Sequence, residues 1–343
     1  MKQKIRFSGR VLMTGAMLCL SVLYTGLALA ASGSGGYADH PRAQPFIDKM
    51  VSEHGWDEAE VRAILAQARK QDSVIESIER PAESKAWAQY QDIFLTDKRL
   101  QGGVEFWRQH ADTLARAERE YGVPSEIIVS ILGVETYYGQ RMGTYLVVDT
   151  LVTQAFEFDP GVWRARFGLE QLEHLFLLSR EQGLNPLELK GSYAGAMGYG
   201  QFIPSSYRHF AVDFDGDGVA DIWNSPVDAI GSVANYLSEN GWRRGGAITV
   251  PAQVAANADR EVLNRALKAD SKVSSLASKG YRAATSVAEQ AAGAVELEGK
   301  NGAEYWLGLH NYFVITTYNH SRLYAMAVYQ LSEQVKGRRE QAS

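Results

Sequence analysis

Apolar residues recur at intervals of three or four along most of the chain, which is the spacing of one face of an α-helix. Phe46, Ile47 and Met50 begin such a pattern over 45–68, and Asp57 marks a second helix start within it. The same spacing predicts further helices over 103–121, 125–136, 162–181, 226–240 and 322–335. These patterns predict a mainly α-helical fold.

Residues 247–309 depart from the helical pattern. Short β-like runs lie at 248–251, 294–297 and 305–309, and turn residues separate them. The sequence between the runs is rich in Ala, Ser and Lys. A chain of 343 residues also exceeds the usual size of a single hydrophobic core. We therefore predict a small β or mixed subdomain over 247–309, inserted into the helical body.

Residues 1–30 have the order of features of a secretory signal peptide. The first ten carry four basic residues and no acid, an apolar run follows from 11 to 30, and the run ends with Ala28-Leu29-Ala30. An uncleaved membrane anchor is the alternative, because the run is about as long as a minimal membrane-spanning helix. The A-x-A end and the Ser- and Gly-rich residues 32–36 favour cleavage after Ala30.

The single cysteine, Cys19, lies inside this segment. A lipid anchor on Cys19 is disfavoured, because Met17 and Leu18 precede it where a lipoprotein signal has small residues. After cleavage the chain has no thiol, which excludes disulfides, cysteine-bound zinc and a cysteine nucleophile. We expect an exported, soluble protein with no integral membrane segment and with a flexible start over 31–42.

Cleavage also changes the charge of the chain. The full sequence has 35 basic and 40 acidic residues and a net charge of −5. Loss of the four basic residues at the start leaves 31 basic residues and a net charge of −9. Such acidity disfavours nucleic acid and anionic lipid as partners. No phosphate-binding loop of the form G-x-x-x-x-G-K-[ST] occurs, and we expect no organic cofactor.

Glu135 continues the apolar face of its predicted helix. It lies three residues after Leu132 and four after Ile131, so helical spacing places its carboxyl on the buried face, and Gly133 leaves space beside it. Burial disfavours the ionised form and raises the pKa, which suits a general acid near neutral pH. Alternatively, the helix ends here, and Glu135 reaches solvent or pairs with Arg141.

Residues 191–204 concentrate glycine and other small residues around Tyr193, Met197, Tyr199 and Gln201. A segment of this composition allows a ligand or another backbone to approach closely. Aromatic rings beside polar groups suit a sugar, whose faces stack on rings and whose hydroxyls need hydrogen bonds. Ordinary tight packing between helices is the alternative.

An acidic segment at 213–221 matches the start of an EF-hand calcium loop. Its acids at alternate positions are Asp213, Asp215 and Asp217. A glycine at the sixth position and the Val219 carbonyl at the seventh complete the match. The twelfth position is Asn224 instead of the usual glutamate, and Asp228 follows four residues later. We predict a calcium site, with a solvated acidic turn as the alternative.

Six segments of the chain recur in matching order in one known family. They are GVET at 133–136, the glycine-rich block at 191–202, PSSY at 204–207, AVDF at 211–214, PVDAIGSVANY at 226–236 and YNHS at 318–321. On these segments the chain resembles the lytic murein transglycosylase B family, over about 43–335. The resemblance implies a lysozyme-like helical core, a helical N-terminal lobe and a small inserted β subdomain.

The resemblance also implies a reaction and a location. Such enzymes cleave the β-1,4 bond between N-acetylmuramic acid and N-acetylglucosamine of peptidoglycan without water, leaving 1,6-anhydromuramic ends, and soluble members work in the periplasm. Within this chain the resemblance implies a catalytic region over 43–336 and a tail over 337–343. A hydrolytic muramidase and a non-catalytic peptidoglycan-binding protein are the alternatives, and protein partners stay unidentified.

The residues of the site follow from the same resemblance. Glu135 matches the family's single catalytic acid and base. The positions implied for sugar binding are Ser192, Tyr193, Met197, Gln201, Tyr207, Tyr318 and Asn319. The calcium ligands implied are Asp213, Asp215, Asp217, the Val219 carbonyl and Asp228. Family members often have serine at the Asp215 position, and the spacing before Asp228 is one residue longer here.

Overall fold

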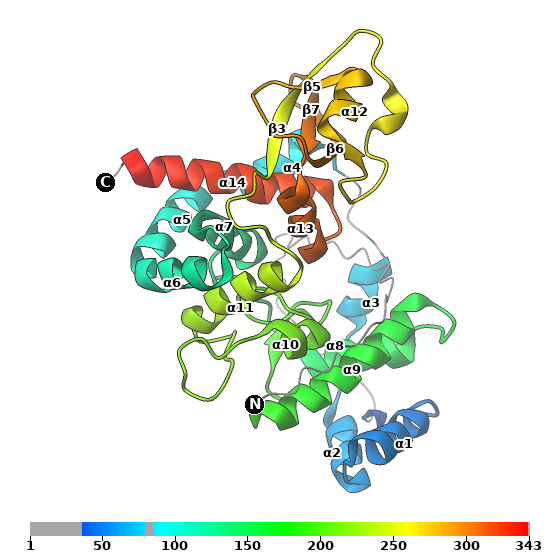
Figure 1. The fold of residues 1–343 in the computed structure, drawn as a ribbon. Helices are drawn as coiled ribbons and strands as arrows, with labels where there is room; N and C mark the ends of the chain where they lie inside the picture. Colours follow the sequence, from blue (N-terminus) through cyan, green and yellow to red (C-terminus); the bar gives the residue numbers. More distant parts are fainter. Residues whose placement is uncertain (1–35, 80–84, 342–343) are drawn as a thin grey trace, which may run out of the picture.

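The computed structural model describes residues 36–79 and 85–341, and the predicted signal peptide at 1–30 lies outside them. The described chain is mainly helical, as predicted (Figure 1). Its first seven helices are α1 (Ala43–His54), α2 (Glu58–Gln67), α3 (Asp72–Glu79), α4 (Trp87–Phe94), α5 (Asp97–Gln109), α6 (Ala111–Tyr121) and α7 (Ser125–Thr136).

The other long helices carry the second half of the helical body. They are α8 (Val147–Glu157), α9 (Trp163–Gln182), α10 (Pro204–Phe210), α11 (Pro226–Glu239), α13 (His310–Tyr318) and α14 (Arg322–Gln341). The last of these includes residues 337–341, so the region assigned to the tail is helical there. No helix of the described residues is long and apolar enough to cross a membrane.

Two breaks in the helical pattern have different causes. Asp57 caps α2 by accepting a hydrogen bond from the Glu60 amide at 3.1 Å, as its position predicts. The prediction of one helix over 103–121 is wrong, because the chain leaves the helical conformation at His110 (φ −117°, ψ 28°). There α5 packs against α14 while α6 packs against α11, so the two apolar faces have different partners.

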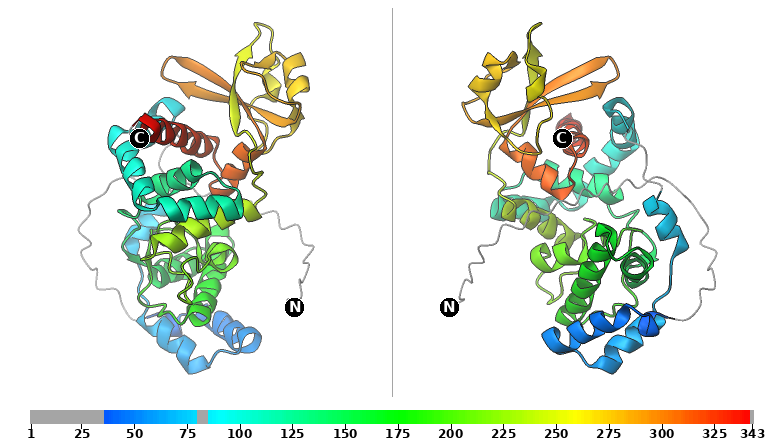
Figure 2. Two further views of the ribbon diagram at one scale, coloured as in Figure 1. Left: turned by 60° about the vertical axis from the view of Figure 1, so that its left-hand side comes forward. Right: turned by 90° about the vertical axis from the view of Figure 1, so that its right-hand side faces the viewer.

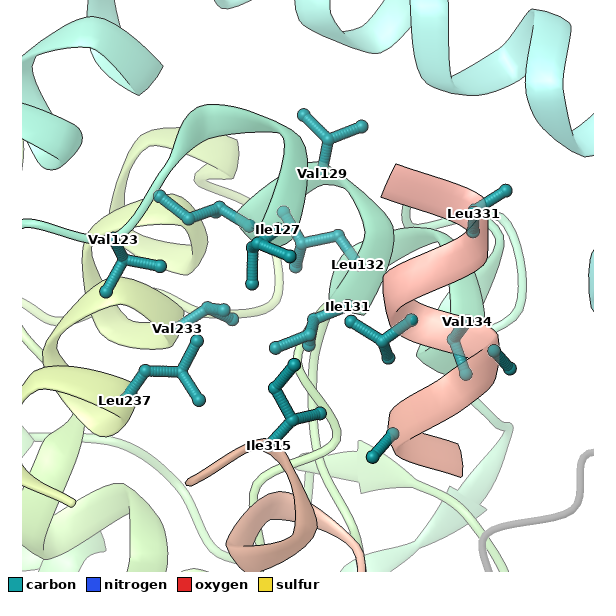
Figure 3. Close-up of a cluster of buried hydrophobic side chains, with 14 of the residues drawn as sticks. Val123, Ile127, Val129, Ile131, Leu132, Val134, Val233, Leu237, Ile315 and Leu331 are labelled. Atoms are coloured by element: carbon teal, nitrogen blue, oxygen red, sulfur yellow. The ribbon is translucent and has the colours of Figure 1, made fainter. Parts of the chain in front are cut away.

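Glu135 lies in the larger of the two cores of the helical body. This core surrounds α7 and contains side chains from α11, α13 and α14, as Figure 3 shows for Val123, Ile131, Val233, Ile315 and Leu331. Because α7 is apolar on all sides, it is buried along nearly its whole length. A second core joins α8 and α9 to the N-terminal helices α1 and α2.

The start of the described chain packs onto this second core. The sequence predicts flexibility over 31–42, yet Tyr37 is buried, and its hydroxyl donates a hydrogen bond to Glu157 Oε1 at 2.9 Å. The Tyr37 ring also stacks on Phe156 at 5.5 Å. Tyr37 is therefore packed against the second core, and residues 31–35 of the predicted flexible start lie outside the described residues.

The predicted β subdomain is a five-stranded antiparallel sheet with its own small core (Figure 2). Its strands are β3 (Thr249–Val254), β4 (Ser271–Lys272), β5 (Tyr281–Ala283), β6 (Ala291–Gly299) and β7 (Gly302–Gly308), in the order β4-β6-β7-β3-β5. The short helix α12 (Val273–Ser278) lies between β4 and β5. The β6–β7 hairpin extends from the subdomain and contacts α4 of the helical body.

Candidate active site

The carboxyl of Glu135 is buried near the end of α7. Only 7% of the residue is exposed, and burial raises the pKa of Glu135 to about 8. The Tyr324 hydroxyl donates a hydrogen bond to Glu135 Oε1 at 2.6 Å and partly offsets that rise. Arg141 is exposed, and its guanidinium lies over the Tyr137 ring at 5.4 Å. Glu135 is thus on the buried face of the helix, and neither alternative, solvent nor pairing with Arg141, applies.

Tyr324 connects Glu135 to the polar segment at the end of α13. Its ring stacks on Tyr318, with 6.3 Å between the ring centroids and 9° between the planes. The Tyr318 hydroxyl donates a hydrogen bond to the Gly200 carbonyl at 2.6 Å. These contacts bring together α7, α14, α13 and the glycine-rich segment, which lie far apart in the sequence.

Sequence reasoning missed Tyr324. The residue lies within an apolar stretch at the start of α14, and this pattern is typical of a core position. No local pattern indicates that its hydroxyl meets a carboxyl 189 residues away. Only the packing of α14 against α7 reveals the pair.

Two residues with positive φ end the helix that carries Glu135. Tyr137 and Tyr138 have φ of 55° and 60°. Arg99 Nε donates a hydrogen bond to the Gly133 carbonyl at 3.0 Å, and the Tyr138 hydroxyl donates to the Arg99 carbonyl at 2.9 Å. The expectation of open space at Gly133 is wrong, since a Cβ there would lie 2.6 Å from the Tyr138 hydroxyl oxygen. Gly133 instead admits the Tyr138 ring.

The glycine-rich segment approaches α7 closely, as its composition predicts. The Thr136 hydroxyl, one residue after Glu135, donates a hydrogen bond to the Tyr199 carbonyl at 2.8 Å. A Cβ at Gly139 would lie 2.1 Å from the Tyr199 ring, so only glycine fits beneath that ring. Gln201 has φ of 51°, and its amide nitrogen donates to the Met142 carbonyl at 3.2 Å.

The other predicted sugar-binding residues fall into two groups. Ser192 and Tyr193 are half-buried, as is Tyr318. Met197 has no exposed surface, and Tyr207 is buried with its hydroxyl donating to the Ala220 carbonyl at 2.8 Å. Asn319 is buried at the end of α13. Met197 and Tyr207 therefore pack inside the protein, beneath the surface of the glycine-rich segment.

The acidic loop brings together three of its predicted ligands. Oxygens of Asp213, Asp215 and Asp217 lie within 4.8 Å of one another. All three residues are exposed, and none forms an ion pair within the described chain. The Val219 carbonyl accepts a hydrogen bond from the Asp221 amide at 3.0 Å. Three unneutralised carboxylates at this separation repel one another, which a bound cation would relieve.

Asp228 lies outside this convergent set. It is fully buried at the start of α11, and both of its oxygens accept backbone hydrogen bonds. Oδ1 accepts from Phe214 at 2.7 Å and from Asp215 at 3.1 Å, while Oδ2 accepts from Asp221 at 2.8 Å. The side chain therefore ties the two ends of the loop to the helix.

Comparison with known proteins identifies the family. Residues 38–333 match the family described as the transglycosylase SLT domain. Membrane-bound lytic murein transglycosylase B of Escherichia coli (strain K12) is 44% identical over 312 residues, which cover 88% of this chain and 84% of that protein. The chain belongs to the lytic murein transglycosylase B family. It is a lytic transglycosylase that acts on peptidoglycan, as its sequence motifs predict.

Solved structures of related transglycosylases have the same fold. The Escherichia coli lytic transglycosylase Slt35 in complex with calcium is 44% identical with a TM-score of 0.81, over 90% of this chain and 96% of that one. SltB3 of Pseudomonas aeruginosa in complex with NAG-anhNAM-pentapeptide is 29% identical with a TM-score of 0.75, over 86% and 79% of the two chains. The helical core and inserted β subdomain predicted for a transglycosylase B fold are thus confirmed.

Proposed function

We propose that Glu135 alone serves as acid and base in cleaving the β-1,4 bond between N-acetylmuramic acid and N-acetylglucosamine, leaving 1,6-anhydromuramic ends. The isolation of its carboxyl carries this proposal. Within residues 36–79 and 85–341, only burial and the Tyr324 hydroxyl shift the pKa of Glu135, and no second carboxylate contributes. Most glycosidases need two carboxyls. A single buried acid favours a reaction in which the substrate supplies the nucleophile.

The reaction has two halves. Protonated Glu135 donates its proton to the glycosidic oxygen as the bond from that oxygen to C1 of N-acetylmuramic acid breaks. The N-acetyl carbonyl of the same sugar stabilises the positive charge that develops at C1. The Glu135 carboxylate then takes the proton of the C6 hydroxyl, whose oxygen bonds to C1 and closes the anhydro ring. A pKa of about 8 keeps Glu135 protonated at neutral pH for the first half.

Tyr324 acts here as a positioning residue. Its hydroxyl donates to Oε1 of Glu135 at 2.6 Å, and among the described residues it is the one hydrogen-bond donor that shifts the pKa of this carboxyl. We infer that Oε2 faces the glycosidic oxygen and carries the transferred proton. A donor on Oε1 also stabilises the carboxylate that forms midway through the reaction.

For substrate binding we propose Ser192, Tyr193, Gln201, Tyr318 and Asn319. Their segments are joined to α7 through Thr136 and Tyr324, so sugar binding and acid position are linked. Met197 and Tyr207, which are buried, would act by holding this surface in place. Analysis of the products released from peptidoglycan tests the reaction as a whole.

We also propose that Asp213, Asp215 and Asp217 hold a calcium ion, together with the Val219 carbonyl. The convergence of three carboxylates supports this assignment, as does the calcium complex of Slt35. Calcium prefers six to eight oxygen ligands, so water would complete the set. Asp228 would then order the loop through its backbone hydrogen bonds, and would not need to touch the ion.

Calcium is therefore expected to raise the thermal midpoint of unfolding of the wild-type chain. A ligand present at one hundred times its Kd adds about 2.7 kcal/mol to the free energy of unfolding. For a domain of this size, that gain raises Tm by roughly 5 °C. Asp213→Asn should abolish the shift, as scanning calorimetry with calcium and with EDTA would measure. Asp159→Asn is the matched control, because Asp159 is also exposed and accepts a backbone hydrogen bond, from Gly161 at 2.7 Å. An equal calcium shift in Asp213→Asn would refute the assignment.

We propose a periplasmic location after removal of residues 1–30. The substrate lies in the cell envelope, outside the cytoplasmic membrane, so the reaction requires export. The Escherichia coli relative is named as membrane-bound, and attachment of this chain to the membrane would be detected by fractionation of cells. We further propose a catalytic region over 43–336 that includes the β subdomain at 247–309.

A further inference from the structure

Arg99 is a buried cation beside the end of α7. It lies on α5, only 6% of the residue is exposed, and burial lowers the pKa of its guanidinium. No carboxylate of the described residues contributes to the pKa of Arg99. A buried charge without an opposite charge is costly, and its replacement by an apolar side chain is often neutral or stabilising. Packing alone therefore does not explain an arginine here, and the contacts of its guanidinium indicate another role.

The guanidinium of Arg99 contacts the chain on both sides of Glu135. Its Nε donates a hydrogen bond at 3.0 Å to the carbonyl of Gly133, two residues before Glu135. Its central carbon lies 5.1 Å from the centroid of the Tyr137 ring, two residues after Glu135. Both contacts are made to the last turn of α7 and its C-cap. Arg99 thus holds the turn that carries Glu135 at both of its ends.

The same guanidinium is also held by α4. Its Nη1 donates a hydrogen bond to the Ile93 carbonyl, and its central carbon lies 5.0 Å from the centroid of the Phe94 ring. The planar group therefore meets one ring and one carbonyl on α4, and one ring and one carbonyl at the end of α7. Lysine has a point charge and no flat face, so it could not make the same set of contacts. Arg99 connects the end of α7 firmly to α4.

The turn after Glu135 has a backbone conformation that needs support from its surroundings. Tyr137 and Tyr138 have φ of 55° and 60°. Side chains other than glycine rarely adopt such angles, which persist only where surrounding contacts hold them. The Gly133 carbonyl accepts from the Tyr137 amide at 3.2 Å as well as from Arg99. Without the guanidinium, this carbonyl would keep one of its two donors, and the Tyr137 ring would lose a packing partner.

We propose that Arg99 is a positioning residue for the cleavage reaction, because it fixes the last turn of α7 and with it the place of the Glu135 carboxyl. Its charge does not contribute to the pKa of Glu135, so it acts through the turn. A displacement of about 1 Å in a site can lower the rate about 10²-fold. This inference rests on the proposed function, since it assigns a further residue to the same reaction.

Arg99→Met tests this role in the full-length mature chain, because methionine keeps the apolar stem but has no donor. We expect kcat on peptidoglycan to fall roughly ten- to hundredfold, with KM within about twofold of wild type. The pH profile should change as well. A looser turn admits water to Glu135, which lowers its pKa from about 8, so the alkaline limb of kcat/KM should move to lower pH. A purely structural role would lower the midpoint of unfolding but would leave kcat and the limb of the folded variant unchanged.

Arg42→Met is the matched control. Arg42 is half-buried, and its guanidinium donates hydrogen bonds to the Phe156 and Phe158 carbonyls, so it also joins two segments through backbone carbonyls. Neither bond reaches α7. This variant should unfold at a lower temperature but keep the kcat and the alkaline limb of wild type.

Arg99→Lys serves as the second variant, since it keeps the charge but loses the flat face and the planar set of donors. Its kcat should fall severalfold, while circular dichroism shows that the fold is retained. A wild-type kcat and an unmoved limb in either folded Arg99 variant would overturn the proposal. Loss of the fold in both would overturn it too, because Arg99 would then be required for folding. Failure of the wild type to cleave peptidoglycan would instead overturn the proposed function.

Discussion

Glu135→Gln is expected to abolish turnover while the variant still binds glycan strands. Glutamine has nearly the same shape as glutamate, but it can neither give a proton to the glycosidic oxygen nor take one from the C6 hydroxyl. General acid–base catalysis contributes about 10²–10⁴-fold, and here one residue performs both transfers. We therefore expect a loss at or above the upper end of this range. Release of soluble muropeptides from peptidoglycan measures it, and co-sedimentation with peptidoglycan measures binding.

Glu126→Gln is the matched control on the same helix. Glu126 lies in the first turn of α7 and pairs with Lys336 at 2.9 Å, away from Glu135. This variant should retain nearly full activity. Substantial turnover by Glu135→Gln, measured beside it, would rule out the assignment of Glu135.

Glu135→Gln should also change how the free energy of unfolding depends on pH. The pKa of Glu135 is raised from 4.5 to about 8 in the folded chain. The contribution of protonated Glu135 to the free energy of unfolding is fully present below pH 4.5. It is lost as pH rises to about 8, because Glu135 ionises at a lower pH in the unfolded chain than in the folded one. Between pH 4 and pH 8 the free energy of unfolding of Glu135→Gln should therefore rise by on the order of 4 kcal/mol relative to that of wild type. Denaturant unfolding at the two pH values would measure this gain.

Tyr324→Phe is expected to shift the pH profile to higher pH and to lower kcat by at least roughly tenfold, because a hydrogen bond to a charged group contributes about 1.5–3 kcal/mol. The Tyr324 hydroxyl stabilises the ionised form of Glu135, so its removal raises the pKa of Glu135 above its value of about 8. Activity needs protonated Glu135 and is lost as pH rises through that pKa. The alkaline limb of kcat/KM should therefore move to higher pH, while kcat falls because the carboxylate formed midway is less stabilised.

Tyr312→Phe separates this effect from a general loss of packing. Tyr312 is also fully buried, and its hydroxyl donates a hydrogen bond to the Arg322 carbonyl at 2.8 Å, without contact to Glu135. Its removal should lower the free energy of unfolding but leave the alkaline limb in place. If the profile of Tyr324→Phe coincides with that of wild type, Tyr324 does not position Glu135.

The helical elements were accessible from sequence because their signals are local. The apolar run of α7, the cap at Asp57 and the β-like residue runs of β6 and β7 each lie within one segment. The break at His110 was not accessible, because it depends on α5 and α6 having different packing partners. Periodicity alone cannot reveal that difference between two adjoining helices.

In the candidate site too, some features follow from local sequence and others depend on contacts between distant elements. Burial of Glu135 was predicted from helical spacing, although nearly every residue of α7 is buried whichever face it lies on. Convergence of the three aspartates follows from their alternation in a short loop. The Tyr324 hydroxyl bond and the saturation of Asp228 by backbone amides depend on contacts between distant elements. Sequence also suggested space at Gly133, where the structure has the Tyr138 ring. Tertiary packing determines each of these features.

Digestion of peptidoglycan in ¹⁸O-labelled water tests the central claim most directly. If Glu135 transfers both protons and the C6 hydroxyl is the nucleophile, mass spectrometry should find products that lack one water and carry no ¹⁸O at the muramic end. The same digest with Glu135→Gln should contain none of these products. Reducing ends that carry ¹⁸O would mean that water is the nucleophile, and would contradict the account.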